Sequence, residues 1–167
     1  MNGIRKLAEA DRPATLAIIN AAAEVYRGVI PADRWHEPYM SAQELDREIE
    51  TGVNFMGYER DGALVGVMGT QAVKDVVLIR HAYVKPNTQR GGIGGALLAE
   101  AVKRAGKRVL IGTWADAHWA IGFYEKHGFA VVPRDEARRL LTTYWTIPER
   151  QIETSVVLAS AGKQLNR

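Results

Sequence analysis

The segment that most limits the possible folds is a run of glycines between a strand-like segment and a helix-like one. It reads GGIGG over residues 91–95 and follows Pro86, which ends the apolar residues 76–85. Inside a helix each glycine costs about 1 kcal/mol relative to alanine, so four of them need a compensating role. Glycine lets a ligand approach the backbone, and the free amides of a first helical turn attract anions. The segment therefore predicts a strand–turn–helix unit that binds phosphate or diphosphate.

Two common phosphate-binding patterns do not fit these residues. The P-loop requires a Lys-Ser or Lys-Thr pair after its glycines, and none follows here. The dinucleotide fingerprint would place its third glycine at Leu97 and its ribose-binding acid at Trp114. A third pattern, [QR]xxGxG, fits residues 89–94 throughout.

Two helices are expected near the start of the chain. The first begins near Asp11 as its cap, has Pro13 in its first turn and ends before Gly28. The second begins after Ser41, which forms a capping-box pattern with Glu44.

Three strands are predicted next, over residues 53–59, 64–73 and 76–85, because these segments are rich in apolar and β-branched residues. Asp61-Gly62 and Lys74-Asp75 are tight connections between them, so the middle of the chain is predicted to be an antiparallel meander.

The remainder alternates between helical and strand patterns. Helices are expected over 92–104 and 117–126, with a helical turn over 133–141, and strands over 108–113, 129–132 and 153–159. The prediction is one α/β (α+β mixed) domain over residues 1–167, with a mixed, mostly antiparallel sheet and helices on both faces.

Composition removes several classes of protein and site. The 167 residues contain no cysteine, which excludes disulfides, thiol nucleophiles and iron–sulfur clusters. The four histidines lack metal-binding spacing, so no metal is expected.

The net charge of +3 is spread along the chain, and we expect no nucleic-acid partner. We expect no membrane association, because no apolar run approaches 18 residues, and a cytoplasmic protein, because no signal peptide is visible. The sequence leaves open whether the protein forms a homodimer.

A second motif lies about 30 residues after the glycines and reads AIGFYEKHGF over residues 120–129. Together, in this order, the two motifs resemble those of the GNAT superfamily, the Gcn5-related N-acetyltransferases. The resemblance implies the GNAT fold with two splayed strands, and acetyl-CoA as co-substrate. It implies transfer of an acetyl group to a primary amine of a small molecule or a protein.

The resemblance also implies which residues hold the co-substrate. The backbone of Tyr83 and Val84 would bind the pantetheine arm. The diphosphate would be held by Gln89, Arg90, Gly91, Gly92, Ile93, Gly94 and Gly95. Tyr124 matches the family's general acid, and its ordinary pKa of about 10 exceeds the thiol's, about 8.5, so protonating a thiolate is downhill.

The general base is not fixed by the resemblance. Leu78 and Arg80 stand where members of the family often have it, and neither is a base. His81 is the candidate if a bulge turns it; otherwise it packs against a helix with one nitrogen satisfied. Alternatively the amine needs no strong base, or the base is His36, Glu37 or Glu59.

Aromatic residues in connections and at strand ends are candidates for binding the acceptor: Trp35, Trp114 and Tyr144. They would favour a flat or apolar amine, or an ammonium held by cation–π contact. Arg80 and Arg150 would instead favour a carboxylate. Because the expected base is missing, the alternative function is a catalytically weak or inactive CoA-binding module that acts through a partner. The sequence leaves open the acceptor and whether the acyl group is acetyl or longer.

Overall fold

The structure is a computed structural model, in which residues 2–88 and 91–160 are described. By their contacts the residues divide into two units. The first consists of residues 1–72 and 79–106, and the second of residues 73–78 and 107–167. The division runs through one strand, whose first residues belong to the second unit and whose remainder belongs to the first.

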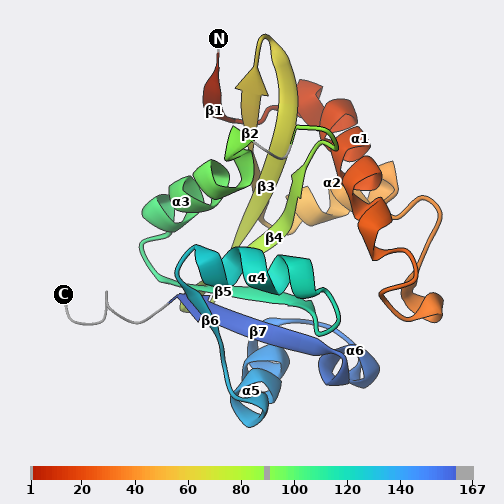
Figure 1. The fold of residues 1–167 in the computed structure, drawn as a ribbon, viewed down its shortest axis with the longest axis vertical. Helices are drawn as coiled ribbons and strands as arrows, with labels where there is room; N and C mark the ends of the chain where they lie inside the picture. Colours follow the sequence, from red (N-terminus) through yellow and green to blue (C-terminus); the bar gives the residue numbers. More distant parts are fainter. Residues whose placement is uncertain (1, 89–90, 161–167) are drawn as a thin grey trace. The chain divides into compact units, whose positions relative to one another are not determined.

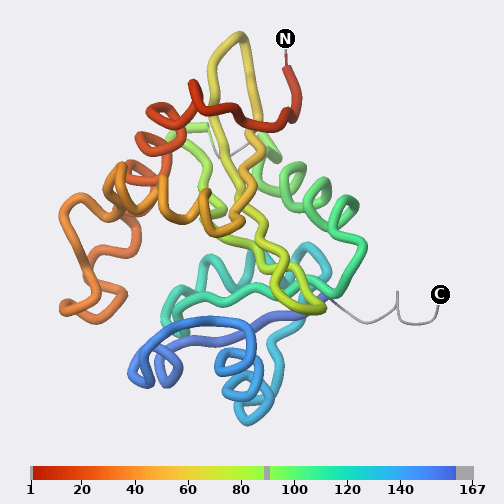
Figure 2. The backbone as a smooth tube through the Cα atoms, turned by 180° about the vertical axis from the view of Figure 1, so that it is seen from behind, coloured from red at the N-terminus to blue at the C-terminus, as the bar shows by residue number. Residues whose placement is uncertain are grey.

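The meander predicted from the sequence forms the sheet of the first unit. Its strands are β1 (Gly3–Lys6), β2 (Val53–Arg60), β3 (Ala63–Val73) and β4 (Val76–Val84). β2 pairs antiparallel with β1 and with β3. Asp61 and Gly62 join β2 to β3 with φ of 53° and 80°, the two left-handed positions of a tight hairpin. Figure 2 shows this hairpin as the yellow loop.

Helices cover both faces of this sheet (Figure 1). α1 (Arg12–Ala22) and α2 (Ala42–Glu50) bury Ile19 and Leu45 against Val53, Phe55 and Val67 on one face. α3 (Ile93–Ala105) packs directly on the backbone of β3 at Gly66. A Cβ added at Gly66 would lie 2.8 Å from Cγ2 of Ile93, so glycine sets the close approach of helix and sheet.

The cap predicted for α2 is confirmed, whereas the one predicted for α1 is wrong. Ser41 Oγ accepts from the Glu44 amide at 3.1 Å, and Glu44 accepts from the Ser41 amide at 2.9 Å. α1 begins after Asp11, yet the Asp11 carboxylate makes no cap bond to this helix. It accepts instead from the Ala8 amide at 2.7 Å and from Arg5 Nη1 at 2.9 Å. The sequence analysis missed β1, the strand that brings Arg5 to this carboxylate.

In the second unit, β7 lies between two antiparallel neighbours. The strands are β5 (Arg108–Trp114), β6 (Phe129–Val131) and β7 (Ser155–Ser160), and β7 pairs with both others. Figure 1 shows α4 (His118–Lys126) and α5 (Arg134–Tyr144) on opposite sides of this sheet. α5 buries Leu140 and Leu141 against Leu110 and Val157.

Two elements of this unit differ from the expectation. The helical turn predicted over 133–141 is a helix that extends to Tyr144, because Ala137, Leu140 and Leu141 form a buried face. A short helix that was not predicted, α6 (Glu149–Glu153), buries Ile152, and β7 therefore begins at Ser155 rather than at residue 153.

The predicted fold class is confirmed. The hydrogen-bonded strand order is β1-β2-β3-β4-β5-β7-β6, with β4 belonging to both units. The pairings of β1 with β2, β2 with β3, β5 with β7 and β6 with β7 are all antiparallel. The chain is therefore an α/β protein with a mostly antiparallel sheet and helices on both faces.

Candidate functional site

The glycines predicted to bind an anion form the start of α3. Gly92 is the residue before the helix and has φ of 70°, a left-handed backbone conformation that residues with a Cβ rarely adopt. Ala96 donates its amide to the Gly92 carbonyl at 3.0 Å, closing the first turn. The amides that precede Ala96 in this turn have no acceptor within the helix. They belong to Ile93, Gly94 and Gly95, three of the residues predicted to hold diphosphate.

Arg60 adds a positive charge to this turn. It ends β2, and a Cβ built on Gly91 would collide with its guanidinium. A guanidinium beside the N-terminus of a helix of 13 residues is a favourable place for an anion. The sequence analysis missed Arg60, because nothing in its neighbourhood along the chain marks it. Gln89 and Arg90, which were also expected here, lie outside the described residues.

Tyr83 and Val84, which are predicted to bind the pantetheine arm, are the last residues of β4. The Tyr83 ring belongs to an aromatic cluster. Its centroid lies 6.5 Å from those of Tyr26 and Tyr39, and the Tyr83 hydroxyl donates to the Tyr39 hydroxyl at 3.4 Å. Burial raises the pKa of Tyr39, and the hydrogen bond from Tyr83 offsets part of this effect. Trp35, predicted to contact the acceptor, joins the cluster 5.6 Å from Tyr39.

The alternative bases of the first unit are less suited to accept a proton. Glu37 accepts a hydrogen bond from Trp35 Nε1 at 2.7 Å and forms an ion pair with Arg27, and both interactions lower its pKa. Glu59 pairs with Arg5 at 3.2 Å. His36 is exposed.

His81 occupies an irregular position in β4. Its φ is 55°, whereas a regular strand has negative φ throughout. Its Nε2 is hydrogen-bonded to Oε1 of Glu48, a residue of α2. The imidazole also stacks on Phe55 of β2, with centroids 6.0 Å apart. His81 therefore combines features of both arrangements expected from the sequence: its backbone is irregular, and its ring packs against a helix with one nitrogen satisfied.

Tyr124, the predicted acid, lies on α4 in the second unit. Its side chain is buried, and its ring centroid lies 5.2 Å from that of Phe123 and 6.3 Å from that of Phe129. The same ring thus anchors α4 to β6. Ala117 is fully buried before the first turn of α4.

The other two predicted acceptor residues also belong to the second unit. Trp114 ends β5, opposite Ser155 of β7. Tyr144 packs against the buried residues of α5 and donates its hydroxyl to Asp75 Oδ1 at 2.6 Å. This hydrogen bond raises the pKa of Tyr144 and lowers that of Asp75. Tyr144 therefore ties the end of α5 to the turn between β3 and β4.

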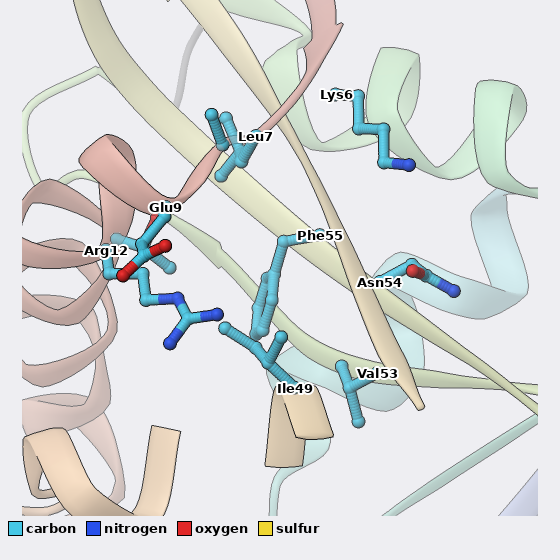
Figure 3. A pocket seen from close by; sticks show the side chains of 10 residues that line it. Lys6, Leu7, Glu9, Arg12, Ile49, Val53, Asn54 and Phe55 are labelled. Atoms are coloured by element: carbon cyan, nitrogen blue, oxygen red, sulfur yellow. The ribbon is translucent and has the colours of Figure 1, made fainter. Parts of the chain in front are cut away.

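A cavity of about 130 Å³ lies in the first unit, between α1, the end of α2 and β2 (Figure 3). Leu7, Ile49, Val53 and Phe55 make much of its wall apolar. Two of its polar side chains have partners: Arg12 pairs with Asp46 at 2.9 Å, and Thr15 donates to the Asp11 carbonyl at 2.9 Å. None of the residues predicted for the site lines this cavity.

Among residues 2–88 and 91–160, no group of three or more histidine or acidic side chains is placed to hold a metal ion. No helix in the described part of the chain has the length and apolar character needed to cross a membrane.

Several solved structures share the fold of this chain. A PaiA N-acetyltransferase from Thermoplasma acidophilum, in complex with coenzyme A, has a TM-score of 0.72 at 20% identity and covers 96% of this chain and 98% of its own. The ribosomal-protein-S18-alanine N-acetyltransferase from Escherichia coli has a TM-score of 0.66 at 22% identity, with 96% and 93% covered. A GNAT family acetyltransferase from Elizabethkingia anophelis with acetyl-CoA bound has a TM-score of 0.64 at 19% identity, and the match covers 95% of each chain.

At the level of sequence, no curated protein matches this chain. The acetyltransferase (GNAT) domain family, however, matches residues 20–142, which include both motifs and most of the described helices and strands. The chain therefore belongs to the GNAT acetyltransferase family.

Proposed function

We propose that this protein transfers an acetyl group from acetyl-CoA to a primary amine of a small molecule or a protein. The observation that carries the proposal is the start of α3. There Gly91 lets the Arg60 guanidinium lie against the backbone and supply a positive charge, nothing lies within 4 Å of a Cβ built on Gly92, and the first-turn amides lack helical acceptors. These features suit the diphosphate of coenzyme A, and similar structures contain coenzyme A or acetyl-CoA.

The proposed reaction is direct attack by the neutral amine on the thioester carbonyl. The new bond joins nitrogen to the acetyl carbon, and the bond from that carbon to sulfur breaks. The nitrogen loses a proton, for which His81 is the proposed acceptor. The departing thiolate gains a proton, for which Tyr124 is the proposed donor.

The acceptor is proposed to be an amine because similar structures are named as N-acetyltransferases. In the first unit, Trp35, Tyr39 and Tyr83 gather aromatic rings near the end of β4. Such rings favour a flat, apolar or cationic acceptor over a strongly anionic one.

Two measurements test the proposal. Acetyl-CoA at millimolar concentration is expected to raise the melting temperature, because a ligand that binds only the folded state stabilises it. Release of free thiol from acetyl-CoA is then followed over a panel of aryl, alkyl and peptide amines. Turnover with any acceptor supports the transferase. The absence of a thermal shift contradicts it.

The alternative, a CoA-binding module that acts through a partner, gives a different combination of results. Such a module would show the thermal shift with acetyl-CoA and no thiol release with any member of the panel. The two readouts therefore separate an enzyme, a binding module and a protein that does not bind the coenzyme.

A further inference from the structure

The chain direction of β4 changes at His81, and this places two consecutive side chains against one carboxylate. In a regular strand, neighbouring residues point to opposite faces of the sheet. Here Arg80 Nη2 lies 3.6 Å from Oε1 of Glu48, and His81 Nε2 is hydrogen-bonded to the same oxygen. The left-handed backbone of His81, with φ of 55°, accounts for this arrangement. Non-glycine residues with such a φ are uncommon and often occur at functional sites.

The carboxylate determines which nitrogen of His81 carries the proton. Burial raises the pKa of Glu48, but the hydrogen bond from His81 and the charges of His81 and Arg80 outweigh burial, and the pKa is lowered. Glu48 is therefore ionised near neutral pH, and an ionised carboxylate only accepts hydrogen bonds. Nε2 of His81 must then be the donor. In the neutral ring the lone pair that can take a proton is on Nδ1.

Nδ1 of His81 is not fully buried. Among the described residues, His81 makes one hydrogen bond, through Nε2. No buried side-chain nitrogen or oxygen in this part of the chain lacks a hydrogen-bond partner. Because Nδ1 has no such partner among these residues, it is not one of the buried atoms, although the side chain as a whole is 13% exposed. The Nε2–H of the ring is thus directed to Glu48, and Nδ1 carries the free lone pair.

The other elements around the ring hold this orientation. Arg80 is fixed by its hydrogen bond from Nη1 to Gln71 Oε1 at 2.7 Å, and it carries the positive charge that faces Glu48. Phe55 of β2 stacks on the ring with planes 21° apart and brings no charge. Glu48 from α2 carries the charge that contacts His81, and Arg80 from β4 carries the opposite charge beside the same carboxylate.

We propose that Glu48 is a positioning residue for His81: it holds the tautomer with Nε2 protonated, so that Nδ1 is the atom that receives the proton from the acceptor amine. The inference rests on the proposed function for the reaction itself. The proton leaves the attacking nitrogen, binds Nδ1, and gives an imidazolium whose Nε2–H remains bonded to Glu48. A purely structural contact between α2 and β4 would fix the same tautomer, but the rate of acetyl transfer would not depend on it.

The first test reads the tautomer directly, without turnover. The protein is labelled with 15N at its histidines, and the His81 signals are assigned by their loss in His81→Asn. We expect Nε2 protonated and Nδ1 bare at a pH where the ring is neutral. Protonation of Nδ1 instead would overturn the proposal, whatever the enzyme's activity.

The second test compares three variants of α2. Glu48→Ala removes the acceptor and is expected to lower kcat about tenfold, with the KM for acetyl-CoA within twofold of wild type, as for loss of a partner that orients a reacting group. Glu48→Gln retains an oxygen that can accept from Nε2–H and should recover most of this loss. Glu50→Ala, at an exposed acidic residue of the same helix, is the matched control and should change neither quantity.

The outcomes separate this inference from the proposed function. Wild-type activity with equal kcat in Glu48→Ala and Glu50→Ala would disprove the role of Glu48 and leave the acetyltransferase standing. A wild-type protein that turns over no amine would disprove the transferase, and with it the proton transfer to His81. A thermal shift with acetyl-CoA in each variant confirms that it is folded.

Discussion

The guanidinium of Arg60 lies against the backbone of Gly91, so the end of β2 contributes a charge to the turn that precedes α3. Neither a larger residue at 91 nor a neutral one at 60 would reproduce this arrangement. The relationship suggests that Arg60 and the helix start act together on one anion, and it gives the first prediction.

Replacing Arg60 with Gln is expected to weaken the binding of coenzyme A about tenfold, because a charge-assisted hydrogen bond contributes roughly 1.5–3 kcal/mol. Calorimetric titration with coenzyme A measures the change in Kd. Pantetheine, which lacks the diphosphate, serves as the control ligand, and its Kd should stay the same. Arg47→Gln, at an exposed position of α2, is the control variant. Equal weakening of both ligands by Arg60→Gln would show that the residue does not act through the diphosphate.

Removing the hydroxyl of Tyr124 with Phe is expected to lower kcat about 100-fold and to leave the Kd of acetyl-CoA within twofold. The ring would keep its contacts with Phe123 and Phe129, whereas the proton for the thiolate would be lost. Steady-state rates and calorimetry provide the two quantities. Tyr58→Phe removes a hydroxyl from β2 and serves as the control. A change in affinity as large as the change in kcat would argue against the acid role.

Gly66→Ala is expected to lower the free energy of unfolding by about 1–3 kcal/mol, because the new methyl group must displace Ile93 or move α3 from the sheet. Urea denaturation measures the difference. Gly122→Ala is the matched control: Gly122 is exposed within α4, and a Cβ there meets nothing within 4 Å. That substitution should stabilise the protein by up to about 1 kcal/mol. A neutral Gly66→Ala variant would show that α3 can move away without cost.

Asp11 should make stability depend on acid pH. Hydrogen bonds from Arg5 and from the Ala8 amide lower its pKa from 3.8 to about 2. The folded state thus favours the ionised carboxylate of Asp11. The stabilisation that Asp11 provides is therefore complete above its pKa in the unfolded chain, near 3.8, and is lost as the pH falls through about 2. Asp11→Asn is expected to cost about 1 kcal/mol at pH 7, since the pair with Arg5 is partly exposed to solvent.

The comparison of wild type with Asp11→Asn is made by urea denaturation at pH 7 and at pH 2.5. The difference in the free energy of unfolding should be smaller at the lower pH. Asp116→Asn, at an exposed residue, is the control, and its effect on the free energy of unfolding should not change comparably between the two pH values. A difference for Asp11→Asn that grows on acidification would contradict the assigned cause.

Much of the fold was predictable because its signals are local. The capping box of Ser41 and Glu44, the hairpin at Asp61-Gly62 and the left-handed Gly92 each depend on residues a few positions apart. The elements that were missed lack such signals. β1 has four residues and becomes a strand by pairing with β2, and α6 has five residues and is held by the burial of Ile152.

The candidate site divides in the same way. The sequence by itself determined the glycine turn, the two family motifs and the candidate role of Tyr124, because each is a pattern of consecutive residues. Only the tertiary structure decided that Arg60 reaches Gly91 and that Glu48 bonds His81. These contacts join residues far apart in the chain. Whether they meet depends on where strands end, how α2 packs, and one left-handed residue in β4, none of which neighbouring residues specify.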